Sequence, residues 1–240
     1  MKMTDITRPV RKLLPLKTCG AVIVAAGTAS RMGGIDKVMA ELGGEPMILR
    51  TVRAFQECDP ISEIIVVTRE DLIERITALI SGMDKVKAVV VGGASRQDSV
   101  GKGLNALSDK VKLVAIQDGA RPFAAWQMID RVVRAANTYS AAAPAIPVKD
   151  TIKVVGGGVV TNTPDRKTLM AVQTPQVFDL ALLRGALLKA WQDGAEVTDD
   201  CSAVERMGMS VKIVEGDERN IKITTPMDLK IAELILEDWA

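Results

Sequence analysis

The sequence contains no histidine among its 240 residues. This absence excludes histidine-based catalytic triads, histidine metal sites and an imidazole general base. Aromatic residues make up only 3% of the chain, which argues against a stacking platform for single-stranded nucleic acid. The net charge of +1 also argues against nucleic-acid binding as the main role.

Cysteine and long apolar segments are scarce as well. Cys19, Cys58 and Cys201 lack metal-ligand spacing and form no disulfide framework, so we interpret them as reduced thiols of a cytoplasmic protein. Among residues 1–17, the charged side chains are basic except for Asp5. No apolar run long enough for a signal peptide or a membrane span follows these residues. We expect residues 1–18 to form an N-terminal extension, and we expect no membrane and no nucleic acid as a partner.

The composition, 48% apolar and 25% charged, is typical of a globular protein with a sizeable core. Apolar periodicity predicts strands at residues 21–25, 63–68, 87–91, 112–117 and 141–148. It predicts helices after Pro46, at residues 69–80, up to about residue 107, and at residues 126–138. This alternation indicates an α/β fold, in which a Rossmann-like, mostly parallel (mixed) sheet is flanked by helices on both faces.

The pattern changes after residue 150. Residues 151–155 and 159–161 are rich in β-branched side chains and enclose three glycines, which predicts a β-hairpin. A lone hairpin is marginally stable in water, so we expect this protruding arm, at about residues 148–174, to pack on a second copy of the chain. We expect helices at residues 179–191 and 198–207, a strand at 211–214 and a helix starting at Thr225. Residues 19–240 then form one domain that includes the arm.

A candidate phosphate-binding loop follows the first strand. The residues after Ala25 are small, so backbone N–H groups around Ala26 and Gly27 can approach an anion closely. Arg31 and Lys37 add two positive charges beside that position. The spacing fits neither a Walker A loop nor a dinucleotide fingerprint. The pattern predicts a phosphate cradle, and the alternative is an ordinary turn with two solvated basic residues.

Polar residues also follow two later strands, where ligands bind in open α/β sheets. Asp118 stands at a predicted strand tip, which suits an Mg²⁺ site or, alternatively, a helix cap or turn. Arg121 can bind a phosphate or pair with Asp118. Arg96 and Ser99 follow a Gly-Gly turn, and they can donate to a base or phosphate or cap the next helix.

Several of these residues carry a family resemblance: Ala25-Ala26-Gly27, Arg31-Met32-Gly33, Lys37, Gly92-Gly93, Arg96, Ser99-Val100, Asp118 and residues 120–123. They resemble the sugar-phosphate nucleotidyltransferases. Further matching residues lie later in the chain: residues 147–153, Asp165-Arg166, residues 173–176, Thr198-Asp199-Asp200, Glu215-Gly216 and residues 220–224. They narrow the resemblance to the 2-C-methyl-D-erythritol 4-phosphate cytidylyltransferases over about residues 19–238.

The resemblance implies transfer of a cytidylyl group from CTP to 2-C-methyl-D-erythritol 4-phosphate, with Mg²⁺ and release of pyrophosphate, in non-mevalonate isoprenoid precursor synthesis. The catalytic cations it implies are Arg31, Lys37, Arg166 and Lys222. The implied CTP-binding residues are Ala25, Ala26, Gly27, Gly93, Arg96 and Ser99. The implied sugar-phosphate-binding residues are Asp118, Arg121, Thr151 and Thr174, and Asp118 is also the expected metal ligand. The resemblance further implies a homodimer in which the arm brings Arg166 to the neighbour's site.

The missing histidine agrees with this chemistry. The nucleophile is a phosphate-monoester oxygen whose second pKa is about 6, so it is ionised near neutral pH without a general base. Two alternatives remain: a ribitol- or glycerol-phosphate cytidylyltransferase, and a CTP-binding regulatory module without turnover. The chain departs from the family's usual residues at Ala29, Asp36, Val38, Ala94, Gln117 and Gly119.

Overall fold

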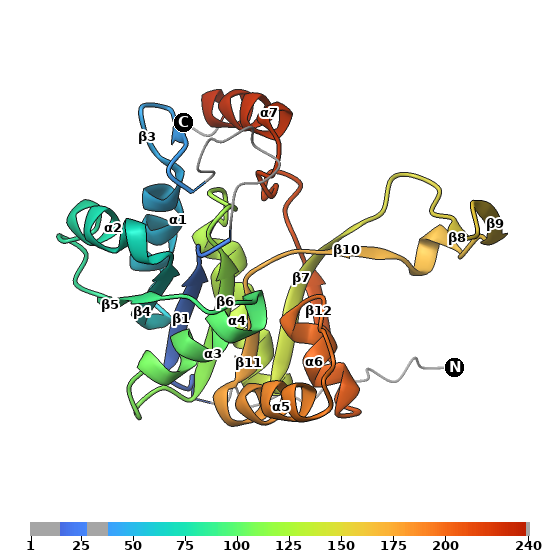
Figure 1. The fold of residues 1–240 in the computed structure, drawn as a ribbon, viewed down its shortest axis with the longest axis horizontal. Helices are drawn as coiled ribbons and strands as arrows, with labels where there is room; N and C mark the ends of the chain where they lie inside the picture. The colour runs from blue at the N-terminus through green and yellow to red at the C-terminus, as the bar shows by residue number, and fades with distance from the viewer. Residues whose placement is uncertain (1–14, 28–37, 239–240) are drawn as a thin grey trace, which may run out of the picture.

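The computed structural model describes residues 15–27 and 38–238. Figure 1 shows a central sheet with helices on both faces and a long arm that extends from one side. The sheet has eight strands in the order β10-β7-β11-β6-β1-β4-β5, and β12 pairs with β7. This arrangement confirms the expected Rossmann-like mixed sheet. The boundary at residue 18 stays a prediction, because residues 1–14 lie outside the described part.

The strands are β1 Cys19–Val24, β2 Glu41–Leu42, β3 Glu45–Pro46, β4 Ile61–Thr68, β5 Val86–Val91, β6 Leu113–Asp118, β7 Ala141–Pro147, β8 Val154–Gly156, β9 Val159–Asn162, β10 Met170–Val172, β11 Gln176–Asp179 and β12 Lys212–Glu215. The helices are α1 Met47–Gln56, α2 Ile73–Leu79, α3 Arg96–Ala106, α4 Trp126–Tyr139, α5 Leu180–Gln192, α6 Asp200–Arg206 and α7 Pro226–Glu237, with short 3₁₀ turns η1 Glu70–Leu72 and η2 Arg166–Thr168. Within residues 15–27 and 38–238, no helix is long and apolar enough to cross a membrane.

The centre of the sheet consists of the parallel strands β6, β1 and β4. They are continuous apolar runs because helices cover both of their faces. In β1, Ala21 and Ile23 face the core beside α1 and α4, whereas Val22 faces the core beside α3 and α5. This alternation follows the two-residue period of a strand. The parallel strands end at one edge of the sheet, and that edge holds the site described below.

The antiparallel strands β10 and β11 were not expected. The sequence interpretation began a helix at Asp179, but this residue ends β11 and caps α5, where its side chain accepts hydrogen bonds from Ala181 and Leu182. β11 pairs with β6 and β7, with Gln176 opposite Ile116. These strands are short and carry polar ends, so their periodicity is too weak to predict them. The β2–β3 ribbon escaped prediction for the same reason.

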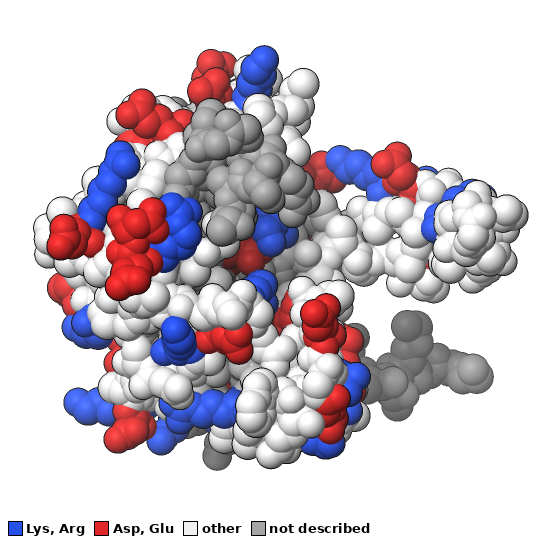
Figure 2. Space-filling model, in the orientation of Figure 1, with Lys and Arg blue, Asp and Glu red and all other residues white. Residues whose placement is uncertain are grey.

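The arm contains the predicted hairpin, but its first strand begins later than expected. β8 starts at Val154, so residues 151–153 lie outside it. Gly157 and Gly158 form the turn with φ values of +58° and +80°, a region that glycine adopts without a steric penalty. Val159 is 68% exposed, and most of the arm's tip is free of charged side chains in Figure 2. The arm thus carries an aliphatic surface away from the body.

Candidate active site

A cavity of about 510 Å³ lies at the carboxyl ends of β1, β4, β5 and β6. Its lining includes Ala25, Ala26, Gly27, Thr68, Gly92, Gly93, Arg96, Ser99, Asp118, Gly119 and Lys222. In open α/β sheets this edge is the usual ligand site. All six residues expected to bind CTP therefore line one cavity, together with Asp118 and Lys222.

Small residues bring the backbone of neighbouring loops together in the cavity floor. The N–H of Ala25 donates to the Val67 carbonyl at 2.7 Å, and the N–H of Gly119 donates to the Val24 carbonyl at 2.9 Å. A Cβ atom on Gly119 would lie 3.0 Å from that of Ala25, and one on Gly92 would overlap the Ala26 side chain. The close approach therefore requires glycine at position 92 and leaves little room for a side chain at position 119. It brings Ala25, Gly92 and Gly119 together in the lining of the cavity.

The cavity wall includes the first turn of α3. Ser95 is the N-cap and forms a capping box with Asp98. The Ser99 hydroxyl donates to the Ser95 carbonyl at 2.9 Å and accepts the Gly93 N–H at 3.0 Å. Ser99 therefore fixes the Gly93 loop against the helix. The expected helix cap is Ser95 and not Ser99, whose side chain lines the cavity.

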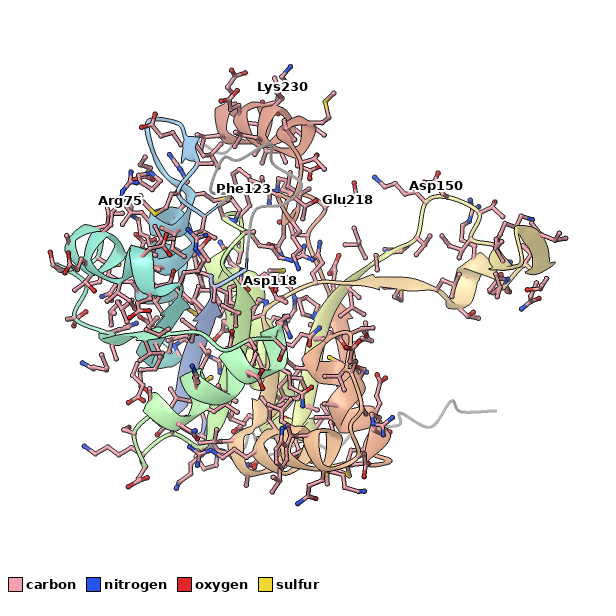
Figure 3. The ribbon with its side chains drawn as sticks, in the orientation of Figure 1. Arg75, Asp118, Phe123, Asp150, Glu218 and Lys230 are labelled. Carbon is pink, nitrogen blue, oxygen red and sulfur yellow. The ribbon has the colours of Figure 1, made fainter. Side chains whose placement is uncertain are left out.

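Asp118 is surrounded by three cations. Its Oδ2 atom lies 2.9 Å from Nζ of Lys222 and 3.4 Å from Nε of Arg121, and its Oδ1 atom lies 3.7 Å from Nη2 of Arg96. Burial alone would raise the pKa of Asp118, but Lys222, Arg96 and Arg121 outweigh that effect and lower it. Asp118 is therefore an ionised carboxylate that holds the Lys222 ammonium at the wall. Figure 3 shows Asp118 near the middle of the molecule.

Arg121 and Thr174 support Asp118 from behind the cavity wall. Arg121 pairs with Asp118, and its Nη1 donates to the carbonyl of Asn220 at 2.7 Å, so the pairing alternative is the one that this structure shows. The Thr174 hydroxyl accepts the Asp118 N–H at 3.1 Å and is buried. These contacts connect the end of β6 to the segment that carries Lys222.

The remaining expected site residues lie elsewhere. Thr151 and Arg166 are exposed on the arm, and Nη1 of Arg166 donates to the Lys149 carbonyl at 2.8 Å. Figure 3 shows Asp150, next to Thr151, far from Asp118. A single protomer therefore does not bring these two arm residues to its own cavity. Arg31 and Lys37 lie outside the described residues, so their place in a phosphate cradle stays a prediction.

The cavity fits an Mg²⁺ ion bound mainly through a substrate. Asp118 is the only carboxylate among the described lining residues, and its Oδ1 atom makes just the long 3.7 Å ion pair with Arg96. Within the described part of the chain there is no cluster of three His, Cys, Asp or Glu residues that could enclose a metal. Mg²⁺ often takes one protein carboxylate plus phosphate oxygens of a substrate, and Asp118 can supply that carboxylate.

Sequence reasoning assigned no role to Asp200 or Gln176. The carboxylate of Asp200 accepts a hydrogen bond from Nη2 of Arg96 at 2.8 Å. Asp200 begins α6 and lies 104 residues after Arg96 in the chain. Gln176 contacts the same helix through its side-chain amide. Both residues occur in stretches that carried the family resemblance, but no local pattern predicts a contact over such a separation.

Comparison with known proteins gives consistent results. The model of the family "2-C-methyl-D-erythritol 4-phosphate cytidylyltransferase" matches residues 19–238. A curated protein of that name from Symbiobacterium thermophilum is 46% identical to this chain, and the match covers 91% of this chain and 93% of that protein. One from Geobacillus kaustophilus is 47% identical, and the match covers 90% of this chain and 96% of that protein.

Solved structures agree as well. A 4-diphosphocytidyl-2C-methyl-D-erythritol synthase from Anaerococcus prevotii is similar with a TM-score of 0.84 and 33% identity, covering 92% of this chain and 96% of that one. A 2-C-methyl-D-erythritol 4-phosphate cytidylyltransferase from Thermus thermophilus has a TM-score of 0.76 and 33% identity, covering 90% and 98%. The resemblance expected from the sequence is thus confirmed, and the chain belongs to the 2-C-methyl-D-erythritol 4-phosphate cytidylyltransferase family.

Proposed function

We propose that this chain transfers the cytidylyl group of CTP to 2-C-methyl-D-erythritol 4-phosphate, in isoprenoid precursor synthesis. Family membership supports the proposal. The observation that carries it is the cavity itself, in which a small-residue floor meets a wall where Lys222 pairs with Asp118 at 2.9 Å. Such a site offers backbone donors and a fixed cation to a triphosphate.

The reaction needs charge stabilisation more than proton transfer. An oxygen of the sugar phosphate attacks the α-phosphorus of CTP, a new P–O bond forms, and the bond to the bridging oxygen breaks to release pyrophosphate. The attacking monoester is ionised near neutral pH, since its second pKa is about 6. Its approach to the triphosphate brings anions together, so the cations must offset the repulsion. We assign this role to Arg31, Lys37 and Lys222, with Arg166 from a second subunit.

The other side chains divide between the two substrates. The backbone from Ala25 to Gly27, with that of Gly93, would hold the nucleotide, and Arg96 and Ser99 would contact the cytidine. Asp118 and Lys222 would meet the sugar phosphate, with Arg121 and Thr174 keeping Asp118 in place through the contacts described above. Thr151 would reach this substrate from the arm of a second subunit.

We propose that Asp118 holds Mg²⁺ together with phosphate oxygens of CTP. When bound, the ion supplies positive charge that offsets the charge developing on the α-phosphate and on the leaving pyrophosphate. The low pKa of Asp118, caused by its three cationic neighbours, keeps this carboxylate ionised and able to serve as a ligand.

We further infer a homodimer joined through the arm. The β8–β9 hairpin exposes Val154, Val155, Val159 and Val160, each between 45% and 68%. An isolated two-stranded hairpin is marginal in water, and a two-fold arrangement would cover these side chains with the same surface of the partner. A cytoplasmic location is also our inference, supported by three buried, free thiols.

Pyrophosphate release from CTP tests the proposed reaction directly. The purified chain is mixed with CTP, Mg²⁺ and, in separate samples, 2-C-methyl-D-erythritol 4-phosphate, ribitol phosphate or glycerol phosphate. We expect release with the first acceptor at a kcat/KM at least about a hundredfold above the other two. Preferential use of ribitol or glycerol phosphate would contradict the proposal. CTP binding without release with any acceptor would identify a binding module instead.

A further inference from the structure

Arg96 reaches the cavity from the start of α3, and it is held there by a residue outside the cavity. Its Nη2 atom donates to Oδ2 of Asp200, the first residue of α6, at 2.8 Å. The side chain of Asp200 is only 1% exposed. Asp200 is absent from the described lining of the cavity. It can therefore affect a bound nucleotide only through its contact with Arg96.

Asp200 is itself fixed to the central sheet through Gln176. Oε1 of Gln176 accepts the backbone N–H groups of Asp200 and Cys201, both at 3.1 Å, and Nε2 donates to the Asp199 carboxylate at 2.7 Å. Gln176 is a buried residue of β11, which pairs with β6 beside Ile116. The first turn of α6 therefore has a defined position relative to the strand that ends in Asp118.

Arg96 lies between two carboxylates at unequal distances. Asp200 accepts a charge-assisted hydrogen bond at 2.8 Å, whereas Asp118 lies 3.7 Å away, beyond hydrogen-bond distance. Oδ2 of Asp118 already meets Lys222 and Arg121. If residue 200 offered no hydrogen-bond acceptor, Arg96 would be drawn toward the free Oδ1 of Asp118. Asp200 thus determines which carboxylate Arg96 binds, and where its guanidinium stands in the cavity.

We propose that Asp200 is a positioning residue that aims Arg96 at the bound nucleotide, with Gln176 as its anchor to the sheet. The inference rests on the proposed function, since it takes CTP as the nucleotide. Burial raises the pKa of Asp200, and the neighbouring guanidinium opposes that shift. The hydrogen bond from Arg96 favours the ionised form of this carboxyl, which burial disfavours. Asp200 should affect CTP binding and leave the acceptor site largely unchanged.

A double-mutant cycle on CTP affinity tests this role. Titration calorimetry gives the Kd for CTP of the wild type, Arg96→Ala, Asp200→Ala and the double variant. We expect Asp200→Ala to weaken CTP binding about tenfold, with little change in the KM for the acceptor. If Asp200 acts through Arg96, the double variant binds CTP no more weakly than Arg96→Ala alone, because the losses are not additive.

Two further variants separate positioning from folding. Asp200→Asn keeps the shape and one acceptor oxygen, so it should recover part of the CTP affinity that Asp200→Ala loses. It also serves as the test variant if the alanine protein does not fold. Glu205→Gln makes the same carboxylate-to-amide change at an exposed position of α6 and should leave the Kd unchanged. Thermal unfolding of every variant verifies that the fold is intact.

The outcomes are distinct. Additive losses in the Arg96→Ala background, or a folded Asp200→Ala protein with wild-type CTP affinity, would overturn the positioning role. A wild type that binds CTP but releases no pyrophosphate would overturn the proposed reaction and still allow the cycle to be measured. A wild type with no CTP binding would overturn both.

Discussion

Asp118 lies within ion-pair distance of three cations from three separate segments of the chain. Arg96 begins α3, Arg121 follows β6, and Lys222 precedes α7. Without the shared carboxylate, these positive charges would repel one another in a partly buried site. One residue therefore affects both the stability of this end of the sheet and the charge offered to a substrate.

Replacement of Asp118 by Asn should destabilise the protein in a pH-dependent way. At about pH 7 we expect the free energy of unfolding to fall by about 2 kcal/mol, the scale of lost charged hydrogen bonds. The folded-state pKa of Asp118 is lowered, so its contribution is complete above the unfolded value of about 3.9 and is lost as the pH falls through the lower folded value. The difference between variant and wild type should therefore shrink toward about pH 3.

Urea unfolding at both pH values measures this effect, with the exposed Asp109→Asn as a control for the loss of one carboxylate. A difference between Asp118→Asn and wild type that stays constant with pH would contradict the electrostatic account.

Helix α3 carries Arg96 and Ser99 to the cavity, and its distance from the sheet depends on a glycine. A Cβ atom on Gly103 would overlap Cγ1 of Val22 and lie 2.9 Å from Cγ2 of Val67. Both valines are fully buried β-branched residues of the central strands, so they have little freedom to move. A Cβ atom on Gly101, in the same helix, would lie in open space, with no atom of another described element within 4 Å.

The two glycines should therefore respond in opposite directions to the same substitution. Gly101→Ala should raise the free energy of unfolding by about 0.5–1 kcal/mol, because alanine favours the helix. Gly103→Ala should lower it by about 1–3 kcal/mol through overpacking, and it should weaken CTP binding by displacing the helix. Chemical unfolding and CTP titration of both variants check this contrast, and a stabilised Gly103→Ala protein would refute the close-packing account.

At the scale of the whole molecule, the described cations expected in the site lie in two places, the cavity and the arm. Lys222 and Arg96 line the cavity, whereas Arg166 is exposed on an arm that extends away from it (Figure 1). The arm's aliphatic surface gives a physical reason for contact with a second copy. We therefore expect each complete site to combine Lys222 of one subunit with Arg166 of the other.

Mixing two inactive variants tests this shared site. Arg166→Ala and Lys222→Ala homodimers each carry a defect in both of their sites. In a mixed dimer one site carries both defects and the other carries neither, so activity should return to about a quarter of the wild-type value after full exchange of subunits. Pyrophosphate release before and after mixing measures the recovery.

Exchange itself must be followed independently, for example by native mass spectrometry of the mixture. Demonstrated exchange without recovered activity would rule out the shared site. A monomer by sedimentation at working concentration would exclude the dimer altogether.

The sequence by itself determined the features that depend on near neighbours. Apart from the β2–β3 ribbon, the strand and helix alternation up to β7 was readable from residues within a few positions of one another, as were the glycine turn of the arm and the helix start at Thr225. The small residues after β1 likewise indicated an anion-binding loop. Spacing, capping and backbone freedom act over one or two turns of chain, so a single sequence reveals them.

Only the tertiary structure decided which distant residues meet. Three contacts connect segments far apart in the chain: β11 lies between β6 and β7, Asp118 pairs with Lys222, and Asp200 accepts a hydrogen bond from Arg96. The pairing of Arg121 with Asp118, one of the two alternatives that the sequence left open, is also a contact of this structure. Each depends on which elements become neighbours when the two cores are buried, and a local pattern carries no information about that choice.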